Sequence, residues 1–241
     1  MQAVQWVRSL IFNAQMYVAM LVFGIIYLIP AILSPNGAIA ACHAYCRWVR
    51  WTASWMLGLK VEIRGEPPTD EVMVAPKHQS FLDVLMIYGA IPRGKFIFKS
   101  ILKYAPVIGQ FGLRIGCIPV DRGKRGQAIK KMVADVKAGT AFPGQLIIYP
   151  QGTRIAPGVK APYKVGTGAL YKELNQPVVP VATNVGVFWP KRGVTRHPGT
   201  AGFEFLPRSE PGLPVDEFMA RLEHDVETAS DRLNAEAGFH G

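Results

Sequence analysis

The stretch EVMVAPKHQSFLD, residues 71–83, decides the fold, because an apolar run that reads as a buried strand ends abruptly in a polar block. The polar block carries His78 and Asp83, five residues apart. A second stretch of the same kind, QLIIYPQGTR, occupies residues 145–154. The carboxyl ends of strands are where α/β folds gather their functional residues. Both polar blocks are therefore candidate parts of one site.

His78 is the residue of the first block that suits proton transfer, because imidazole accepts a proton near neutral pH. A neighbouring carboxylate such as Asp83 can fix the ring tautomer and stabilise the imidazolium that forms. The chain contains no G-x-S-x-G nucleophile elbow, so we expect the attacking group to belong to a substrate. A structural alternative stays open, because Ser80 and Asp83 also fit a helix capping box, with His78 as a loop histidine.

The charge of the chain indicates an anionic partner. With 241 residues and a formal net charge of +10, it could bind nucleic acid, an anionic membrane or a phosphorylated substrate. Apolar residues make up 49% of the chain, and it lacks zinc-finger spacing and ribonucleoprotein motifs, which argues against nucleic acid. We therefore expect an anionic membrane surface and a phosphate-bearing substrate as partners.

The three cysteines, Cys42, Cys46 and Cys117, are too few for a disulfide framework and have no company with metal-ligand spacing. We expect three buried, reduced thiols, no metal site, and a catalytic domain on the cytoplasmic side.

The N-terminal part has the composition of a membrane anchor. No Lys, Arg, Asp or Glu occurs between Arg8 and Arg47, and residues 10–33 are almost wholly apolar and long enough to span a bilayer. A cleaved signal peptide is disfavoured, because the run is too long and lacks a small-x-small cleavage site at its end.

A second apolar segment, residues 38–59, sets tryptophans beside basic residues, which is typical of a membrane interface. One spanning helix and a helical hairpin dipping into one leaflet both fit, and a buried soluble hairpin is the structural alternative. Arg8 and Lys60 flank the pair of segments at both ends, which favours the hairpin. We expect association with the cell inner membrane, with the catalytic domain on its cytoplasmic face.

From residue 59 onward, short strand-like runs alternate with helical ones. This alternation predicts an α/β fold with a mixed, partly parallel sheet flanked by helices. Residues 1–58 would form the membrane-anchoring helical hairpin and residues 59–241 the catalytic domain. Helices are predicted over residues 127–137 and 215–235, the second with Asp216 as its cap. Strands are predicted at residues 59–64, 71–75, 95–99, 114–120, 145–149, 177–183 and 201–206.

Two further blocks close apolar runs, IPVDRG at residues 118–123 and VVPVATN at residues 178–184. If the four strands share a sheet with their carboxyl ends on one side, all four blocks converge on one site.

In this order, KHQSFLD, IPVDRG, YPQGTR and VVPVAT resemble the four blocks of the 1-acyl-sn-glycerol-3-phosphate acyltransferases, within the glycerolipid acyltransferase family. That family shows N-H-x4-D, an arginine-bearing F-I-x-R segment, F-P-E-G-T-R and a V-P-x-x-P-like strand. The resemblance covers roughly residues 59 to 210, and the apolar N-terminal extension matches members that ride on the membrane.

The resemblance implies a reaction and roles for two residues. His78 would be the general base, oriented by Asp83, and would deprotonate the free hydroxyl of a lysophospholipid. That hydroxyl would attack the thioester of acyl-CoA or acyl-carrier protein, giving phosphatidic acid. The acyl thioester is a co-substrate, and no cofactor is implied.

The resemblance also implies a phosphate site. Arg122 and Arg154 would hold the substrate phosphate, because the guanidinium fork makes two charge-assisted bonds to its oxygens; a surface salt bridge is the alternative for either. Gly152 and Thr153 would shape a turn that presents N–H groups to the anion. Lys164 would add to this pocket, or simply be a solvated residue at a helix start.

The chain departs from the family pattern at two positions. Lys77 replaces the usual asparagine, and Gln151 replaces the usual glutamate. Gln151 would still hydrogen-bond a glycerol hydroxyl but supplies no negative charge. Two alternatives therefore stay open: an O-acyltransferase for another lysolipid, such as a lyso-ornithine lipid, or a non-catalytic membrane-anchored lipid-binding protein.

Overall fold

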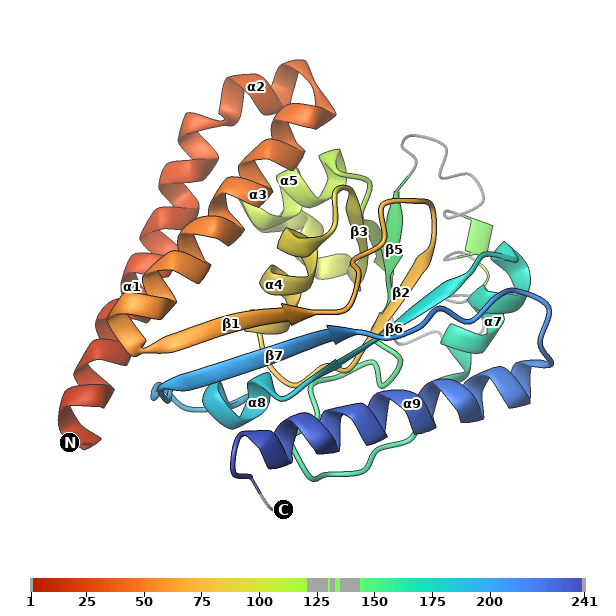
Figure 1. Cartoon of the computed structure of the whole chain (residues 1–241). Helices are drawn as coiled ribbons and strands as arrows, with labels where there is room; N and C mark the ends of the chain where they lie inside the picture. The colour runs from red at the N-terminus through yellow and green to blue at the C-terminus, as the bar shows by residue number, and fades with distance from the viewer. Residues whose placement is uncertain (1, 121–129, 131–132, 135–143, 240–241) are drawn as a thin grey trace.

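Figure 1 shows the computed structural model, which describes residues 2–120, 130, 133–134 and 144–239. The chain begins with three helices and a π-helical turn, and continues as strands alternating with helices. The N-terminal elements are α1 (Gln2–Ile26), α2 (Leu28–Leu33), α3 (Pro35–Thr52) and η1 (Ala53–Leu57). The strands are β1 (Leu59–Arg64), β2 (Met73–Pro76), β3 (Gly94–Lys99), β4 (Ile118–Val120), β5 (Gln145–Ile147), β6 (Val178–Thr183) and β7 (Gly199–Phe205). The later helices are α4 (Leu82–Ala90), η2 (Ser100–Tyr104), α5 (Ile108–Arg114), α7 (Val165–Leu174), α8 (Val185–Phe188) and α9 (Val215–Glu236).

The seven described strands form one sheet in the order β1-β7-β6-β2-β5-β3-β4. Neighbouring strands run parallel, except that β6 and β7 are antiparallel. The predicted mixed, partly parallel sheet is confirmed. Because β2 lies between β5 and β6 and is parallel to both, three of the four polar blocks emerge side by side from the same edge of the sheet.

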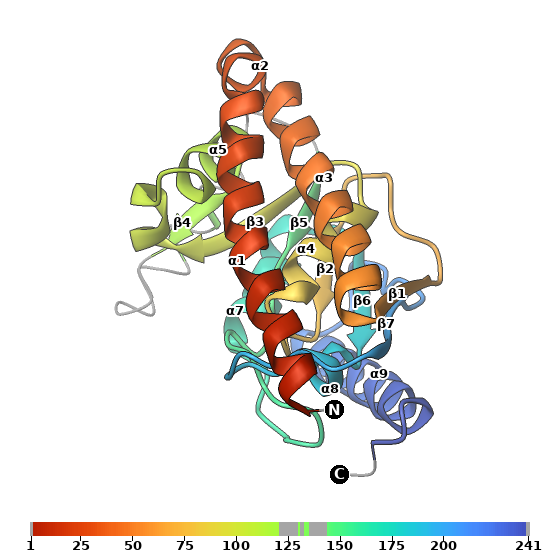
Figure 2. The same cartoon turned by 90° about the vertical axis from the view of Figure 1, so that its left-hand side faces the viewer.

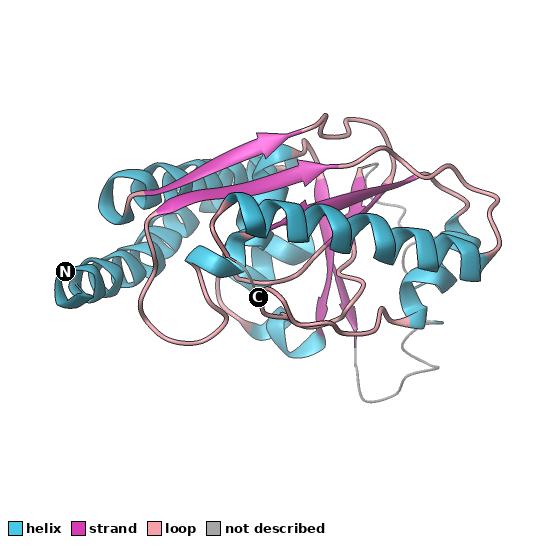
Figure 3. Cartoon of the chain, turned by 60° about the horizontal axis from the view of Figure 1, so that its bottom comes forward, coloured by secondary structure: helices cyan, strands magenta, loops and turns pink. Residues whose placement is uncertain are grey.

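The central strands are buried on both faces, as an internal parallel sheet requires. Every residue of β2, β5 and β6 is buried. Helices α1, α3 and α4 cover one face, and α7 and α9 cover the other, where α9 lies across the strands in Figure 3. Two hydrophobic clusters therefore sit on opposite sides of the sheet.

The N-terminal helices form a hairpin, with α2 at its apex (Figure 2). Ser34 interrupts the helices and caps α3, since its Oγ accepts a hydrogen bond from Asn36 N–H at 3.2 Å. Gly37 permits the tight bend, because a Cβ there would lie 2.2 Å from the Pro30 carbonyl oxygen. The predicted pairing of two apolar segments is confirmed.

The hairpin packs into the core of the α/β part. Phe12 and Val49 are fully buried and belong to the same hydrophobic cluster as Val74 and Val181 of the central strands. The rings of Phe12 and Trp189 meet edge to face, with centroids 5.6 Å apart. Although the backbone passes from hairpin to sheet near residue 58, the two parts share one core.

The outer side of the hairpin remains apolar and exposed. In the described part of the chain, α1 alone is long and apolar enough to cross a membrane. Side chains along its length are more than half exposed, among them Ile11, Val18 and Ile25. Trp51 and Trp55 at the end of the hairpin are each 58% exposed.

Three predicted elements differ from the structure or fall outside it. The strand expected from residue 114 begins only at Ile118, because α5 runs to Arg114 and is followed by a turn that ends at Gly116, whose φ of +86° favours glycine. Asp216 does not cap α9; Pro214 holds that position, and Asp216 lies in the first turn. The helix predicted over residues 127–137 lies mostly outside the described residues.

Candidate active site

The first polar block places a histidine and a carboxylate in direct contact. His78 follows the end of β2, and Asp83 is the second residue of α4. His78 Nδ1 lies 2.9 Å from Asp83 Oδ1. The Asp83 side chain is completely buried, whereas that of His78 is 18% exposed. The pair therefore presents the imidazole to a site and keeps the carboxylate behind it.

The same carboxylate organises the loop that carries His78. Asp83 Oδ2 accepts hydrogen bonds from the backbone N–H groups of Gln79 and Ser80, both at 2.8 Å. Ser80 Oγ accepts from Leu82 N–H at 3.3 Å. The capping interaction and the histidine contact thus occur together, since the two oxygens of one carboxylate divide these roles.

The second polar block, Tyr149 to Arg154, docks directly on the first. Gly152 N–H donates to the Tyr149 carbonyl at 2.9 Å, and the φ of Gly152 is +67°, which confirms the predicted turn. Ile155 N–H donates to the His78 carbonyl at 2.7 Å. The rings of His78 and Tyr149 stack with centroids 4.0 Å apart. Burial, reinforced by the nearby Asp83 carboxylate, raises the pKa of Tyr149.

The block after β6 also reaches the histidine loop. Lys77 N–H donates to the Val181 carbonyl at 2.9 Å, as a neighbour of the β2–β6 ladder. Gln79 is completely buried, and its Oε1 accepts from Gly186 N–H at 2.9 Å. Three of the four blocks therefore meet around His78.

The block at residues 118–123 is described only in part. Its strand β4 forms the edge of the sheet beside β3, and Arg122 lies outside the described residues.

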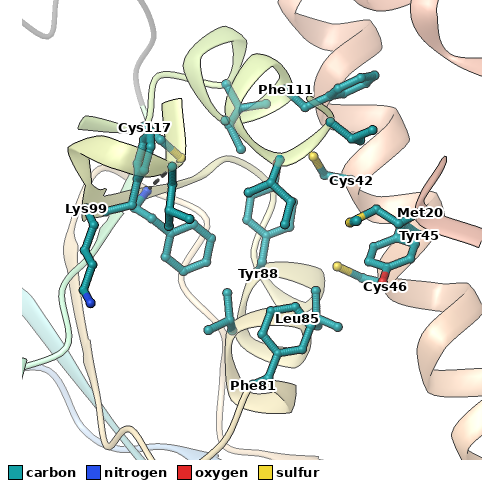
Figure 4. Close-up of a pocket in the computed structure, with 18 of the residues that line it drawn as sticks. Met20, Cys42, Tyr45, Cys46, Phe81, Leu85, Tyr88, Lys99, Phe111 and Cys117 are labelled. Atoms are coloured by element: carbon teal, nitrogen blue, oxygen red, sulfur yellow. Dashed lines mark hydrogen bonds between the residues drawn. The ribbon is translucent and has the colours of Figure 1, made fainter. Parts of the chain in front are cut away.

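An apolar cavity of about 750 Å³ opens beside the histidine. His78, Tyr149, Gly152, Thr153 and Arg154 line it together with residues of the hairpin and of the helices after β2 and β3. The side chains drawn in Figure 4 come from both parts of the chain, and Tyr88 stands between Cys117 and the cysteines of α3. The cavity wall is therefore built jointly by the N-terminal helices and the α/β part.

Among the described residues, Lys99, Arg154 and Lys191 are the cations that line the same cavity. Arg154 was predicted from the sequence, whereas Lys99 and Lys191 were not. Lys191 Nζ donates to the Arg154 carbonyl at 2.8 Å, which fixes a second cation beside the Tyr149–Arg154 turn. Lys99 closes β3, and a lysine at the end of a predicted strand was the one signal for it in the sequence.

Two predicted substrate-binding residues lie elsewhere. Gln151 is 2% exposed, is absent from the described cavity lining, and donates from Nε2 to Glu227 Oε1 of α9 at 3.4 Å. Lys164 is exposed at the start of α7, where its N–H donates to the Pro150 carbonyl at 2.8 Å. Its side-chain stem lies near Gly152, 3.6 Å from the position of an added Cβ.

Cys42, Cys46 and Cys117 are free thiols in the structure, the last two of them buried. Within the described residues, no group of three His, Cys, Asp or Glu side chains is placed to hold a metal ion. The described part of the site combines a paired histidine, nearby cations and an adjoining apolar cavity.

Residues 59–184 match the acyltransferase family, and the chain belongs to that family and is an acyltransferase. It is 28% identical over 204 residues to the 1-acyl-sn-glycerol-3-phosphate acyltransferase of Pseudomonas aeruginosa, covering 83% of this chain and 79% of that protein. It is 30% identical over 175 residues to the 1-acyl-sn-glycerol-3-phosphate acyltransferase alpha of Mus musculus, covering 70% of this chain and 61% of that one.

The fold has a solved counterpart. The crystal structure of the 1-acyl-sn-glycerophosphate (LPA) acyltransferase PlsC from Thermotoga maritima matches with a TM-score of 0.79 and 19% sequence identity, over 96% of this chain and 97% of that one. The match extends beyond residues 59–184 and includes nearly the whole chain. The fold class expected from the sequence is confirmed.

Proposed function

We propose that this acyltransferase moves an acyl group from acyl-CoA or acyl-carrier protein to the free hydroxyl of 1-acyl-glycerol-3-phosphate, giving phosphatidic acid for phospholipid synthesis. One observation carries the proposal: His78, which is paired with the buried Asp83, lines one apolar cavity together with the Arg154 cation. A lysophosphatidic acid has a hydroxyl, a phosphate and an acyl chain, which correspond to these three features.

His78 acts as the general base. Asp83 Oδ1 accepts the hydrogen bond from the Nδ1–H group, which leaves Nε2 to take the proton of the acceptor hydroxyl. The alkoxide oxygen attacks the thioester carbonyl carbon, and the tetrahedral intermediate collapses by expelling the thiolate, which takes up the proton from His78. A base in this position contributes a factor of about 10²–10⁴ to the rate.

The cations of the cavity hold the acceptor phosphate. Arg154 makes two charge-assisted hydrogen bonds to phosphate oxygens, and Lys191 and Lys99 add positive charge. Arg122, which lies outside the described residues, and Lys164, whose side-chain stem lies near Gly152, keep the phosphate-binding role that the resemblance implies. Gly152 shapes the turn, with its own N–H bonded to the Tyr149 carbonyl, and the following Thr153 is the residue of this turn that offers a backbone N–H to the anion. Holding both substrates together lowers the entropic part of the barrier.

The apolar cavity holds an acyl chain. Its wall includes Met20 and Phe23 of α1 and Phe111 of α5. Burying a methylene of the chain contributes about 0.8 kcal/mol. Because the hairpin forms part of the cavity wall, the acyl chain of the substrate passes from the membrane into the site without entering water.

The hairpin, residues 1–58, anchors the catalytic part, residues 59–241, to one leaflet of the inner membrane from its cytoplasmic face. The exposed apolar side of α1 and the exposed Trp51 and Trp55 support this arrangement. The pairing of α1 with α3 supports a hairpin over a single spanning helix, because the chain returns to the side from which it started.

The test is thioester turnover by the purified full chain in mixed micelles, with acyl-CoA and acyl-carrier protein as alternative donors. Lysophosphatidic acid is compared with a zwitterionic lysolipid and a lyso-ornithine lipid. Turnover restricted to lysophosphatidic acid is the expected result. Turnover restricted to another lysolipid would replace the proposed acceptor, and no turnover with any acceptor would leave a lipid-binding protein.

A further inference from the structure

A cluster of four side chains lies on the far side of the site loops from the cavity; Lys77 and Gln151 are buried in it, and Glu227 and Tyr163 are partly buried. Its centre is the Glu227 carboxylate on α9, which forms an ion pair with the Lys77 ammonium. Gln151 Nε2 donates to Glu227 Oε1 at 3.4 Å, and the Tyr163 hydroxyl donates to the same oxygen at 3.0 Å. One carboxylate therefore receives three donors from two different loops.

The position of the cluster follows from the alternation of side chains along a strand. Val74 belongs to the cluster of the hairpin face and Ala75 to that of the α7–α9 face. Where β2 ends, Lys77 pairs with α9, whereas His78 lines the cavity. Adjacent residues of one block thus serve opposite faces of the sheet.

The second site loop repeats this division. Tyr149 and Arg154 line the cavity, while Gln151 between them reaches back to Glu227. Glu227 therefore joins the residue next to the proposed base to a residue inside the turn that carries the proposed phosphate ligand. The two loops cannot shift against each other without breaking a contact to this carboxylate.

The buried ammonium of Lys77 makes the cluster dependent on the Glu227 carboxylate. The Lys77 side chain is 3% exposed, and a buried ammonium requires an anionic partner. Burial raises the pKa of Tyr163, and the Glu227 carboxylate beside it raises that pKa further, so the tyrosine stays a neutral donor. A second carboxylate at position 151 would repel Glu227, and the amide of Gln151 avoids this.

We propose that Glu227 is a positioning residue for acyl transfer: through Lys77 and Gln151 it holds the His78 loop and the Tyr149–Arg154 loop at their working separation. This rests on the proposed function. It also accounts for both departures from the resembling pattern as one exchange, in which Lys77 and Gln151 face a carboxylate supplied by the C-terminal helix. Gln151 therefore does not report a changed headgroup.

Glu227→Gln tests the proposal, with Glu223→Gln as the matched control, because Glu223 is exposed one helical turn earlier on α9. Turnover is expressed per donor-binding site, titrated with a non-reactive thioether analogue of the acyl donor. We expect kcat to fall at least tenfold in Glu227→Gln, with the KM for the donor within twofold of the unchanged protein. Equal kcat in the two variants would overturn the proposal.

A charge-free pair separates positioning from simple charge neutralisation. Glu227→Gln alone leaves the buried Lys77 ammonium unpaired and should lower the melting temperature. Lys77→Met combined with Glu227→Gln removes both ions, so its melting temperature should lie within a few degrees of that of the unchanged protein. We expect kcat to stay at least tenfold low, because the link between the loops is gone. Full recovery of kcat along with stability would mean that Glu227 merely neutralises Lys77, and would refute a positioning role.

Moving the carboxylate supplies the rescue. Gln151→Glu combined with Glu227→Gln moves the carboxylate from position 227 to position 151 and keeps the contact between the two side chains. We expect kcat to be at least fivefold higher than in Glu227→Gln alone. If kcat stays at the level of Glu227→Gln alone, the loss of turnover is not due to the contact between residues 151 and 227, and the proposal is overturned.

Nuclear magnetic resonance of the five histidines, labelled with ¹⁵N, gives a readout independent of turnover. We expect the His78 ring signals to shift in Glu227→Gln and to stay in place in Glu223→Gln. Absence of turnover in the unchanged protein would remove the proposed function, and these ring signals would then still decide whether Glu227 positions His78. Unshifted signals would overturn it.

Discussion

The imidazole of His78 lies against the phenol ring of Tyr149, with centroids 4.0 Å apart and an angle of 25° between the planes. This contact joins the two site loops on the cavity side of the sheet, opposite the Glu227 junction. Hydrogen bonding to Asp83 fixes one edge of the imidazole, and stacking fixes its face. The histidine is therefore restrained in both rotation and tilt before any substrate binds.

Replacing His78 by alanine should lower kcat by a factor of about 10²–10⁴, because the proposed general base is lost. Binding to vesicles should remain unchanged, since His78 lines the cavity and is not among the exposed apolar side chains of the hairpin. His224→Ala is the control, because His224 is exposed on α9. Turnover is followed by release of the donor thiol, and undiminished turnover in His78→Ala would remove this residue from the mechanism.

Substitutions of Tyr149 should separate its ring from its hydroxyl. Tyr149→Phe keeps the stacking and should retain kcat within about threefold of the unchanged protein, whereas Tyr149→Ala should lower kcat at least tenfold. Removing the ring should also destabilise the fold by about 3–5 kcal/mol, the range for deleting buried aromatic side chains. Denaturant unfolding measures the second effect, and equal kcat in both variants would argue against restraint by stacking.

Arg154→Ala should chiefly raise the KM for a phosphate-bearing acceptor. Hydrogen bonds to charged groups contribute about 1.5–3 kcal/mol, so the expected increase is about tenfold to a hundredfold. The exposed neighbour of Lys191 gives the control Arg192→Ala. Steady-state kinetics with lysophosphatidic acid and a neutral lysolipid provide the comparison, and an equal increase for both acceptors would exclude a phosphate contact.

Deleting residues 1–58 should produce an aggregating protein, because Phe12 and Val49 belong to the core that this deletion opens. A milder variant, Trp51→Ser with Trp55→Ser, alters only exposed rings and should leave the melting temperature unchanged while weakening binding to anionic vesicles severalfold. Sedimentation with vesicles measures the binding. A soluble, active protein lacking residues 1–58 would contradict the anchor.

The sequence predicted where the strands lie more readily than where helices end or which elements come into contact. Apolar runs that end in polar blocks located β2, β5 and β6, because a strand buried on both faces is a short continuous run of apolar residues. The run at residues 114–120 was predicted as one strand because Ile115, Cys117, Ile118 and Val120 are apolar, but its first three residues end helix α5 and form the turn after it. Helix ends at a positive-φ glycine are hard to distinguish from strand starts in a short apolar run.

The site was predictable where its residues belong to a local pattern. His78 and Asp83 are five residues apart in the sequence, and their contact follows from that short spacing. Glu227 is 150 residues from Lys77 and sits on a helix that looks like any other amphipathic helix. No spacing rule connects them, because their contact depends on which sheet face α9 covers. The inward direction of Gln151 is a tertiary property of the same kind.

The joint wall of the cavity has a consequence for how such enzymes can be rearranged. Met20 of α1 and Cys42 of α3 face the same space as Tyr88 of α4. The hairpin, proposed above as the membrane anchor, also forms part of the cavity wall and is therefore not an interchangeable module. Grafting a foreign transmembrane segment onto residue 59 would restore attachment to lipid and leave the cavity without one side. The hairpin and the α/β part must therefore be exchanged or retained together, as a single unit.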